Sequence, residues 1–199
     1  MNTTIVDKNV TYYIEELSDL TYSVNKAVHL EIFMVGLKNS HAHIIVNLDH
    51  EGASANVNLI AIANDDIKDI NVRINNNAKH TKANMILKGI AKNSGICNIN
   101  ATGFIDVDCS GSENYQESRV LLLDNASRGE ATPLLLIEHN DVLAGHSASV
   151  SRVDEESIYY LQTRGVNKID AEAILTKAFF QPFLDGCEEE GLEEKIWTI

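Results

Sequence analysis

Apolar and polar residues alternate one by one along much of the chain between residues 28 and 138. Ile70, Val72 and Ile74, for example, are separated by single polar residues. A period of two places successive side chains on opposite faces of a β-strand, so each strand should have one buried face and one face in water. The pattern predicts strands over 28–35, 42–48, 56–63, 69–75, 83–91, 95–109, 119–124 and 133–138.

The longest predicted strand, 95–109, shows both faces. Its apolar face carries Cys97, Ile99, Ala101, Ile105, Val107 and Cys109. Its polar face carries Asn98, Asn100, Thr102, Asp106 and Asp108. We expect both cysteines to pack in the core as small hydrophobic residues, which is the usual state of a buried thiol.

The links between the predicted strands are short and rich in Asn, Gly, Asp and Ser, and the whole chain contains twenty asparagines. Asparagine tolerates the left-handed backbone angles that tight corners need. The links contain neither Asn-Gly nor Asp-Gly, the usual hairpin signals, and none is long enough for a helical crossover. The pattern therefore favours a mainly β fold, and a β-helix of stacked strands fits better than a β-sandwich, the structural rival.

The region after residue 153 changes to a helical pattern. Asp154 can cap a first helix that ends near Gly165, and a second helix begins near Asp170. Pro182 is expected to end or kink the second helix, and an acidic tail over 185–195 is expected to be a solvated surface. The prediction is a short N-terminal segment (1–20), a β-helix core (21–153) and a C-terminal helical region with an acidic tail (154–199).

Composition narrows the class of protein. The net charge of −13 disfavours binding to nucleic acid, whose phosphates it would repel. No apolar run is long enough to span a membrane, and the N-terminus does not resemble a secretory signal, so we expect a cytoplasmic protein. Three widely spaced cysteines indicate neither a disulfide framework nor a zinc knuckle; they are Cys97, Cys109 and Cys187.

A series of landmarks runs along the second half of the chain. They are His80, Lys88-Gly89, Gly103, Gln116, the leucines 121–123, Asp124, Pro133, His146, the segments 150–154 and 159–161, and Arg164-Gly165. In this order they resemble the core of the SufB/SufD family, which belongs to the SUF system of iron–sulfur cluster assembly. The resemblance is strong over residues 80–181 and extends back to residue 28. It implies a right-handed parallel β-helix with a small C-terminal α-helical region, here in a short form that lacks the family's N-terminal helical domain.

The resemblance also implies partners. Family members pair at the end of the β-helix and bind SufC, an ABC-type ATPase, through their C-terminal helices. The residues expected to contact the ATPase are Asp154, Glu155, Ile158, Tyr159, Leu161, Arg164, Ile174 and Phe179. ATP hydrolysis is expected in that partner, since this sequence has no G-x-x-x-x-G-K-[ST] phosphate loop. The chain itself is expected to be a non-enzymatic scaffold or adaptor, in a homodimer or in a heterodimer with a SufB-like chain.

His146 is the candidate metal ligand, as one ligand of an iron–sulfur cluster held transiently at a dimer interface, and Cys109 is a weaker candidate. The sequence departs from the family around His146. Gly145 and Ser147 stand where SufB-type chains have glutamates, and Ala144 stands where SufD-type chains have a cysteine. Two alternatives therefore stay open: a strand histidine that hydrogen-bonds at the dimer seam, and a regulatory or interaction paralogue that has lost cluster binding.

Two further hypotheses are weaker. His41 and His43 share the outward face of one predicted strand, where a histidine pair could chelate zinc or copper, although no third ligand is evident. A β-helix polysaccharide lyase would need clustered acids beside a suitable base, and the sequence shows no such cluster.

Overall fold

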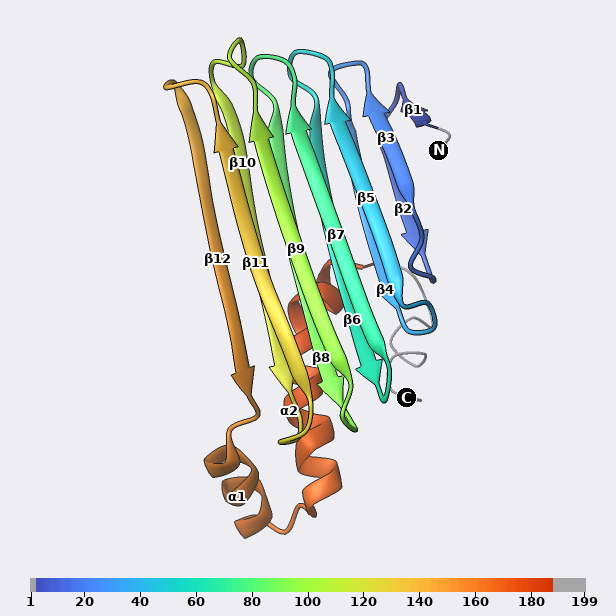
Figure 1. Cartoon of the computed structure of the whole chain (residues 1–199), viewed down its shortest axis with the longest axis vertical. Helices are drawn as coiled ribbons and strands as arrows, with labels where there is room; N and C mark the ends of the chain where they lie inside the picture. The colour runs from blue at the N-terminus through green and yellow to red at the C-terminus, as the bar shows by residue number, and fades with distance from the viewer. Residues whose placement is uncertain (1–2, 188–199) are drawn as a thin grey trace.

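The computed structural model describes residues 3–187 and contains two parallel β-sheets that lie face to face (Figure 1). Within these residues each sheet has six strands, in the orders β1-β3-β5-β7-β9-β11 (sheet A) and β2-β4-β6-β8-β10-β12 (sheet B). The chain crosses from one sheet to the other at every corner, so strands next to each other in sequence lie in different sheets. This is a parallel β-solenoid, which confirms the predicted β-helix and excludes the sandwich.

The strands lengthen toward the C-terminal end. The strands of sheet A are β1 (Thr3–Val6), β3 (Leu20–Val24), β5 (His41–Leu48), β7 (Ile67–Asn76), β9 (Ile96–Ile105) and β11 (Arg128–Ile137). The strands of sheet B are β2 (Val10–Ile14), β4 (His29–Gly36), β6 (Ser54–Asn64), β8 (Lys82–Lys92), β10 (Ser112–Leu122) and β12 (Val142–Arg152). Two helices follow, α1 (Glu155–Thr163) and α2 (Lys168–Gly186).

The core fills the space between the two sheets. One residue in two along each strand points inward, and these residues stack in rows from pass to pass; Val57, Leu59, Ile70 and Ile99 are all fully buried. Burial of a side chain of this size contributes about 1.5–3 kcal/mol. Because each apolar row is continued by the next pass, the period-two pattern in the sequence predicts this core directly.

Helix α2 covers part of the outer face of sheet B (Figure 1). Phe180 and Phe183 of α2 are buried against the outward-facing Phe33, Ile60 and Ile90. The rings of Phe33 and Phe183 meet edge to face at 5.5 Å. The second halves of β4, β6 and β8 are therefore buried on both faces, which explains why their sequences lose the alternation there.

The solenoid begins earlier than the predicted core of 21–153. Strands β1 and β2 lie within the predicted N-terminal segment 1–20 and pair in parallel with β3 and β4. These strands have only four and five residues, too few for a period-two pattern to stand out.

The prediction for 95–109 was too long. Strand β9 ends at Ile105 because Asp106 turns the chain: its carboxylate accepts from the N–H of Val107 at 2.7 Å, and its carbonyl accepts from the N–H of Cys109 at 3.2 Å. Val107 is exposed rather than buried, and Cys109 is buried from a turn rather than from a strand. The predicted strands 119–124 and 133–138 correspond only to the second halves of β10 and β11.

The helical region agrees with the prediction, and of the two outcomes predicted for its proline an end of the helix is excluded. Asp154 caps α1 by accepting from the N–H groups of Glu156 and Ser157. Helix α2 does not end at Pro182 but continues to Gly186, since the turn after the proline carries the buried Phe183. The predicted acidic surface beyond residue 187 lies outside the described residues. Neither described helix combines the length and apolar character that a membrane span requires.

Candidate functional site

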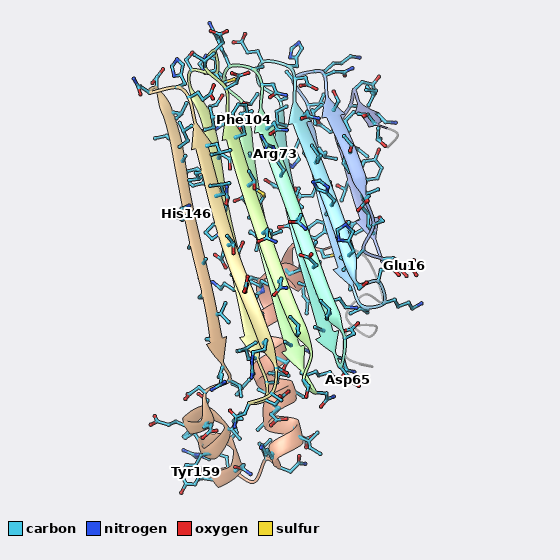
Figure 2. All side chains as sticks on the ribbon, in the orientation of Figure 1. Glu16, Asp65, Arg73, Phe104, His146 and Tyr159 are labelled. Atoms are coloured by element: carbon cyan, nitrogen blue, oxygen red, sulfur yellow. The ribbon has the colours of Figure 1, made fainter. Side chains whose placement is uncertain are left out.

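His146 lies on β12, the last strand of sheet B, at the opposite edge of the solenoid from Glu16 (Figure 2). It is in register with Gln116 of β10, whose side chain points inward and donates to the carbonyl of Leu134 on β11 at 3.0 Å. Residues in register on parallel strands share a face, so His146 continues an inner row of the solenoid. His146 is nevertheless exposed, because no strand follows β12 within the described residues.

The inward-facing residues of β10 from Ser112 to Ser118, beside His146, are polar, unlike those of β6 and β8. The members of this inner row, Ser112, Asn114, Gln116 and Ser118, are all buried. Asn114 Oδ1, Gln116 Oε1 and Ser118 Oγ have no hydrogen-bond partner among the described residues. Gly103 on β9 makes room for this row, since a Cβ there would stand 2.3 Å from Asn114 Oδ1. Two of the family landmarks, Gly103 and Gln116, are thus parts of one packing arrangement.

The neighbours of His146 are Ala144, Gly145 and Ser147, so the cysteine and the glutamates found there in other family members are absent. Gly145 has no side chain beside the Tyr115 ring, and the open pocket of about 370 Å³ at this place includes Tyr115, Glu117 and His146 among its lining residues. Glu117 is already paired with Arg119 at 2.9 Å. His146 therefore offers one imidazole without a thiolate beside it.

None of the three cysteines forms a disulfide within the described residues, and two are deeply buried. Burial raises the pKa of the Cys97 thiol to about 12, and burial also raises the pKa of Cys109. The Cys109 thiol donates to the carbonyl of Asn76 at 3.1 Å. Both act as core residues in this arrangement, and Cys109 lies too deep to join His146 as a surface ligand.

The described residues contain no group of three or more His, Cys, Asp or Glu side chains arranged to hold a metal ion. His41 and His43 do lie on one outward face, where His41 pairs with Asp19 at 3.3 Å. Any metal role for His146 therefore requires ligands from outside the described residues.

The second candidate region is the exposed side of α1 and α2. Tyr159 and Ile169 are 69% and 79% exposed, and Tyr160 and Ile174 are also exposed. Figure 2 shows Tyr159 pointing away from the solenoid at the end of the molecule. We call these four residues the helical apolar surface. Tyr160 of α1 and Ile174 of α2 line one hollow between the helices, and neighbouring exposed apolar side chains of this kind mark candidate interaction sites.

Two hollows flank the helical apolar surface. One, of about 400 Å³, lies between the helices and is lined by Tyr160, Leu161 and Ile174 among others. The other, of about 630 Å³, lies between the helices and the solenoid end, with Arg152 and Lys168 among its lining residues.

The predicted contact residues divide into two groups. Asp154 caps α1, while Ile158 and Phe179 pack toward the solenoid and serve the position of the helices. The other five, all exposed or partly exposed, are Glu155, Tyr159, Leu161, Arg164 and Ile174. Sequence reasoning missed Tyr160 and Ile169, whose exposure depends on how the two helices pack.

Sequence reasoning also missed the polar inner row and the buried Lys68. Residues 112–118 are polar at almost every position, so period two gives no signal there. Lys68 is fully buried in register with Cys97, and its ammonium pairs with Asp66 at 2.6 Å. No hydrophobicity pattern predicts an inward lysine.

The fold and both regions define a class of protein: a parallel β-solenoid that ends in a helical pair with an exposed apolar face. The family model described as "SUF system FeS cluster assembly, SufBD core domain" matches residues 10–179. The chain therefore belongs to the SufBD family, as its landmarks predict.

The relatives bear related names. The chain is 37% identical over 121 residues to the iron–sulfur cluster assembly protein SufD of Bacillus subtilis (61% of this chain, 28% of that protein). It is 28% identical over 149 residues to a SufBD family protein of Mycobacterium bovis (74% of this chain, 18% of that protein). It is 28% identical over 134 residues to one from Staphylococcus epidermidis (67% and 29%). The chain thus matches less than a third of the length of each relative.

Proposed function

We propose that this chain is a non-catalytic component of SUF iron–sulfur cluster assembly that acts in the cytoplasm. In this proposal it binds a SufC-type ABC ATPase through α1 and α2, and it dimerises through the end of the solenoid at β11 and β12. The observation that carries the proposal is the helical apolar surface at the end of a solenoid that matches the SufBD core domain. The names of the relatives, which are iron–sulfur cluster assembly proteins, support the same role.

The helical apolar surface suits a protein partner. Aromatic side chains such as Tyr159 and Tyr160 are frequent hot spots of interfaces. Arg164 lies 5.3 Å from the Tyr160 ring and adds a cation that can pair with a carboxylate. ATP hydrolysis is assigned to the partner, and this chain supplies the surface.

The open end of the solenoid suits a second solenoid. Val150 is 43% exposed, whereas Val120, its counterpart on β10, is 1% exposed. Ile137 is 44% exposed, whereas Ile105, its counterpart on β9, is fully buried. A homodimer or a heterodimer with a SufB-like chain would bury these apolar side chains and the free edge of β12.

An iron–sulfur cluster would be cargo at that interface, with His146 as this chain's ligand. Imidazole nitrogen can ligate iron, but thiolates are the usual cluster ligands, and strands β11 and β12 at this end of the solenoid contain no cysteine. The absence of a neighbouring thiol or free carboxylate favours a second candidate function: an adaptor or regulatory paralogue that binds the ATPase but no cluster.

Size-exclusion chromatography of the chain with its cognate SufC-type ATPase tests partner binding. We expect a complex that is lost in Ile174→Glu and retained in the control Ile67→Glu, since Ile67 is a similarly exposed isoleucine on sheet A. If the wild-type chain forms no complex, the ATPase-binding proposal fails.

Dimerisation is measured by multi-angle light scattering. We expect Val150→Glu to give monomers, whereas Ile5→Glu at the other end of the solenoid should leave the dimer intact. A wild-type monomer at micromolar concentration, alone and with a SufB-like chain, would refute this part.

Anaerobic reconstitution with iron and sulfide separates the two functions. A visible absorbance that disappears in His146→Ala supports shared ligation. A colourless protein that still binds the ATPase supports the adaptor.

A further inference from the structure

Lys88 is a buried cation in the apolar seam between the solenoid and α2. It points outward from β8, near the centre of sheet B, where it lies in register between Ile60 of β6 and Arg119 of β10. Its exposure is only 6%, because α2 covers it. The seam around it is otherwise built from apolar side chains, including Ile60, Ile90 and Phe180.

The ammonium of Lys88 makes a specific contact with α2. Its Nζ donates to the carbonyl oxygen of Phe179 at 2.9 Å, and it also lies 5.3 Å from the centre of the Phe179 ring. Burial lowers the pKa of Lys88, and the positive charge of Arg119 adds to this effect, while the carboxylate of Glu117 opposes it. The contact joins the middle of the solenoid to a helix 91 residues further along the chain.

Hydrophobic contact alone leaves the position of α2 underdetermined. Apolar packing is non-directional, so phenylalanines could slide along the face of sheet B with small losses. A hydrogen bond to one carbonyl is directional and selects one axial position and one rotation of the helix. A cation in an apolar seam carries a desolvation cost, so its advantage over an apolar residue here lies in this selection rather than in burial.

The helix is weakest close to this contact. Pro182 has no N–H, so the carbonyl of Ala178, next to Phe179, lacks its usual helical donor. The bond from Lys88 thus holds α2 beside the turn where its own hydrogen bonding is interrupted.

We propose that Lys88 is a positioning residue: it fixes the seat of α2 on sheet B and thereby presents the helical apolar surface in the geometry that the partner ATPase binds. The second half of this inference rests on the proposed function, whereas the first half does not.

The test is Lys88→Met, which keeps the length and apolar stem of the side chain and removes its donor and charge. The matched control is Lys82→Met, the same change on the same face of β8, where the side chain is 66% exposed and pairs with Glu113. Hydrogen exchange of the α2 amides (168–186) reports how firmly the helix is held on sheet B. Titration with the ATPase reports the affinity of the chain for that partner. Global stability is not the readout, because methionine also removes the desolvation cost of the buried charge.

We expect Lys88→Met to accelerate exchange in α2 and to weaken ATPase binding, each by about tenfold, as for the loss of one charged hydrogen bond. Lys82→Met should change neither. Unchanged hydrogen exchange of α2 in Lys88→Met would refute the claim that Lys88 fixes the position of α2 on sheet B. Faster exchange with unchanged affinity overturns the link to the partner. If the wild-type chain binds no ATPase, the proposed function fails, while the exchange result still decides the role of Lys88.

Discussion

The packing of Gly89 against Cys97 allows a double-mutant test of the core. Gly89 points inward from β8, and a Cβ at this position would stand 2.4 Å from Cys97 Sγ. The next atoms, Ile99 Cδ1 and Val120 Cγ2, would lie at 3.1 and 3.4 Å, distances that small side-chain movements can relieve. The thiol of Cys97 is therefore the main reason for glycine at position 89.

The expected magnitudes follow from this geometry. Gly89→Ala should destabilise the protein by about 1–3 kcal/mol, as for one extra carbon in a close-packed core. Cys97→Ala removes one fully buried heavy atom and should cost about 1 kcal/mol. In the double variant the new Cβ occupies the space of the lost sulfur. Its destabilisation should therefore be at least about 1 kcal/mol smaller than the sum of the single effects, within the range of coupling between residues in contact.

Urea denaturation followed by circular dichroism measures all four proteins. The matched control is Gly89→Ala combined with Cys109→Ala, where the second cysteine is equally buried but is not among the atoms that the new Cβ would meet. That pair should be additive. Additive free energies of unfolding for Gly89→Ala with Cys97→Ala would refute the packing argument.

Three further predictions concern single residues. Hydrogen bonds, above all from the Ser127 hydroxyl, lower the pKa of Asp124 to about 2. The contribution of Asp124 to the free energy of unfolding is therefore complete above pH 4 and is lost as the pH falls toward 2. In Asp124→Asn the free energy of unfolding should depend less on pH in that window. Asp154→Ala should remove the cap of α1 and make exchange of its first amides several-fold faster, whereas Asp154→Asn, which keeps a capping oxygen, should not. Iodoacetamide at pH 8 should modify Cys187 well before Cys97, whose thiol is buried and has a pKa raised to about 12; equal rates would contradict the buried position.

The sequence predicts the solenoid because its core repeats one local rule. Ile70, Val72 and Ile74 alternate with polar residues in the sequence, and the structure buries these three. The first helix is equally predictable from the sequence, since Asp154 is a standard capping residue and it does cap α1. Both predictions need only information within a few residues.

The failures have a different physical origin, because they depend on contacts that are distant in sequence. Of the two outcomes predicted for Pro182, an end of α2 is excluded, since burial of Phe180 and Phe183 against sheet B outweighs one lost helical hydrogen bond. Lys88 takes an outward position on β8, where a lysine is expected to lie in water, but a helix from the far end of the chain buries it. The Tyr160 and Ile169 surface likewise depends on the packing of α1 against α2. None of these positions carries a local signal.

The candidate surfaces lie where the repetition stops, and this has a physical reason. Inside the solenoid the inward-facing residues of each strand are covered by the next strand of the same sheet, so Val120 and Gln116 are buried. On β12 the same rows continue with Val150 and His146, but no further pass covers them within the described residues. A chain that ends a solenoid must therefore expose an inner row, cap it or share it with another chain. Here the chain turns into α1 after Arg152, and the inward-facing residues of β12 stay exposed within the described residues, which is why the proposed dimer interface is placed on them.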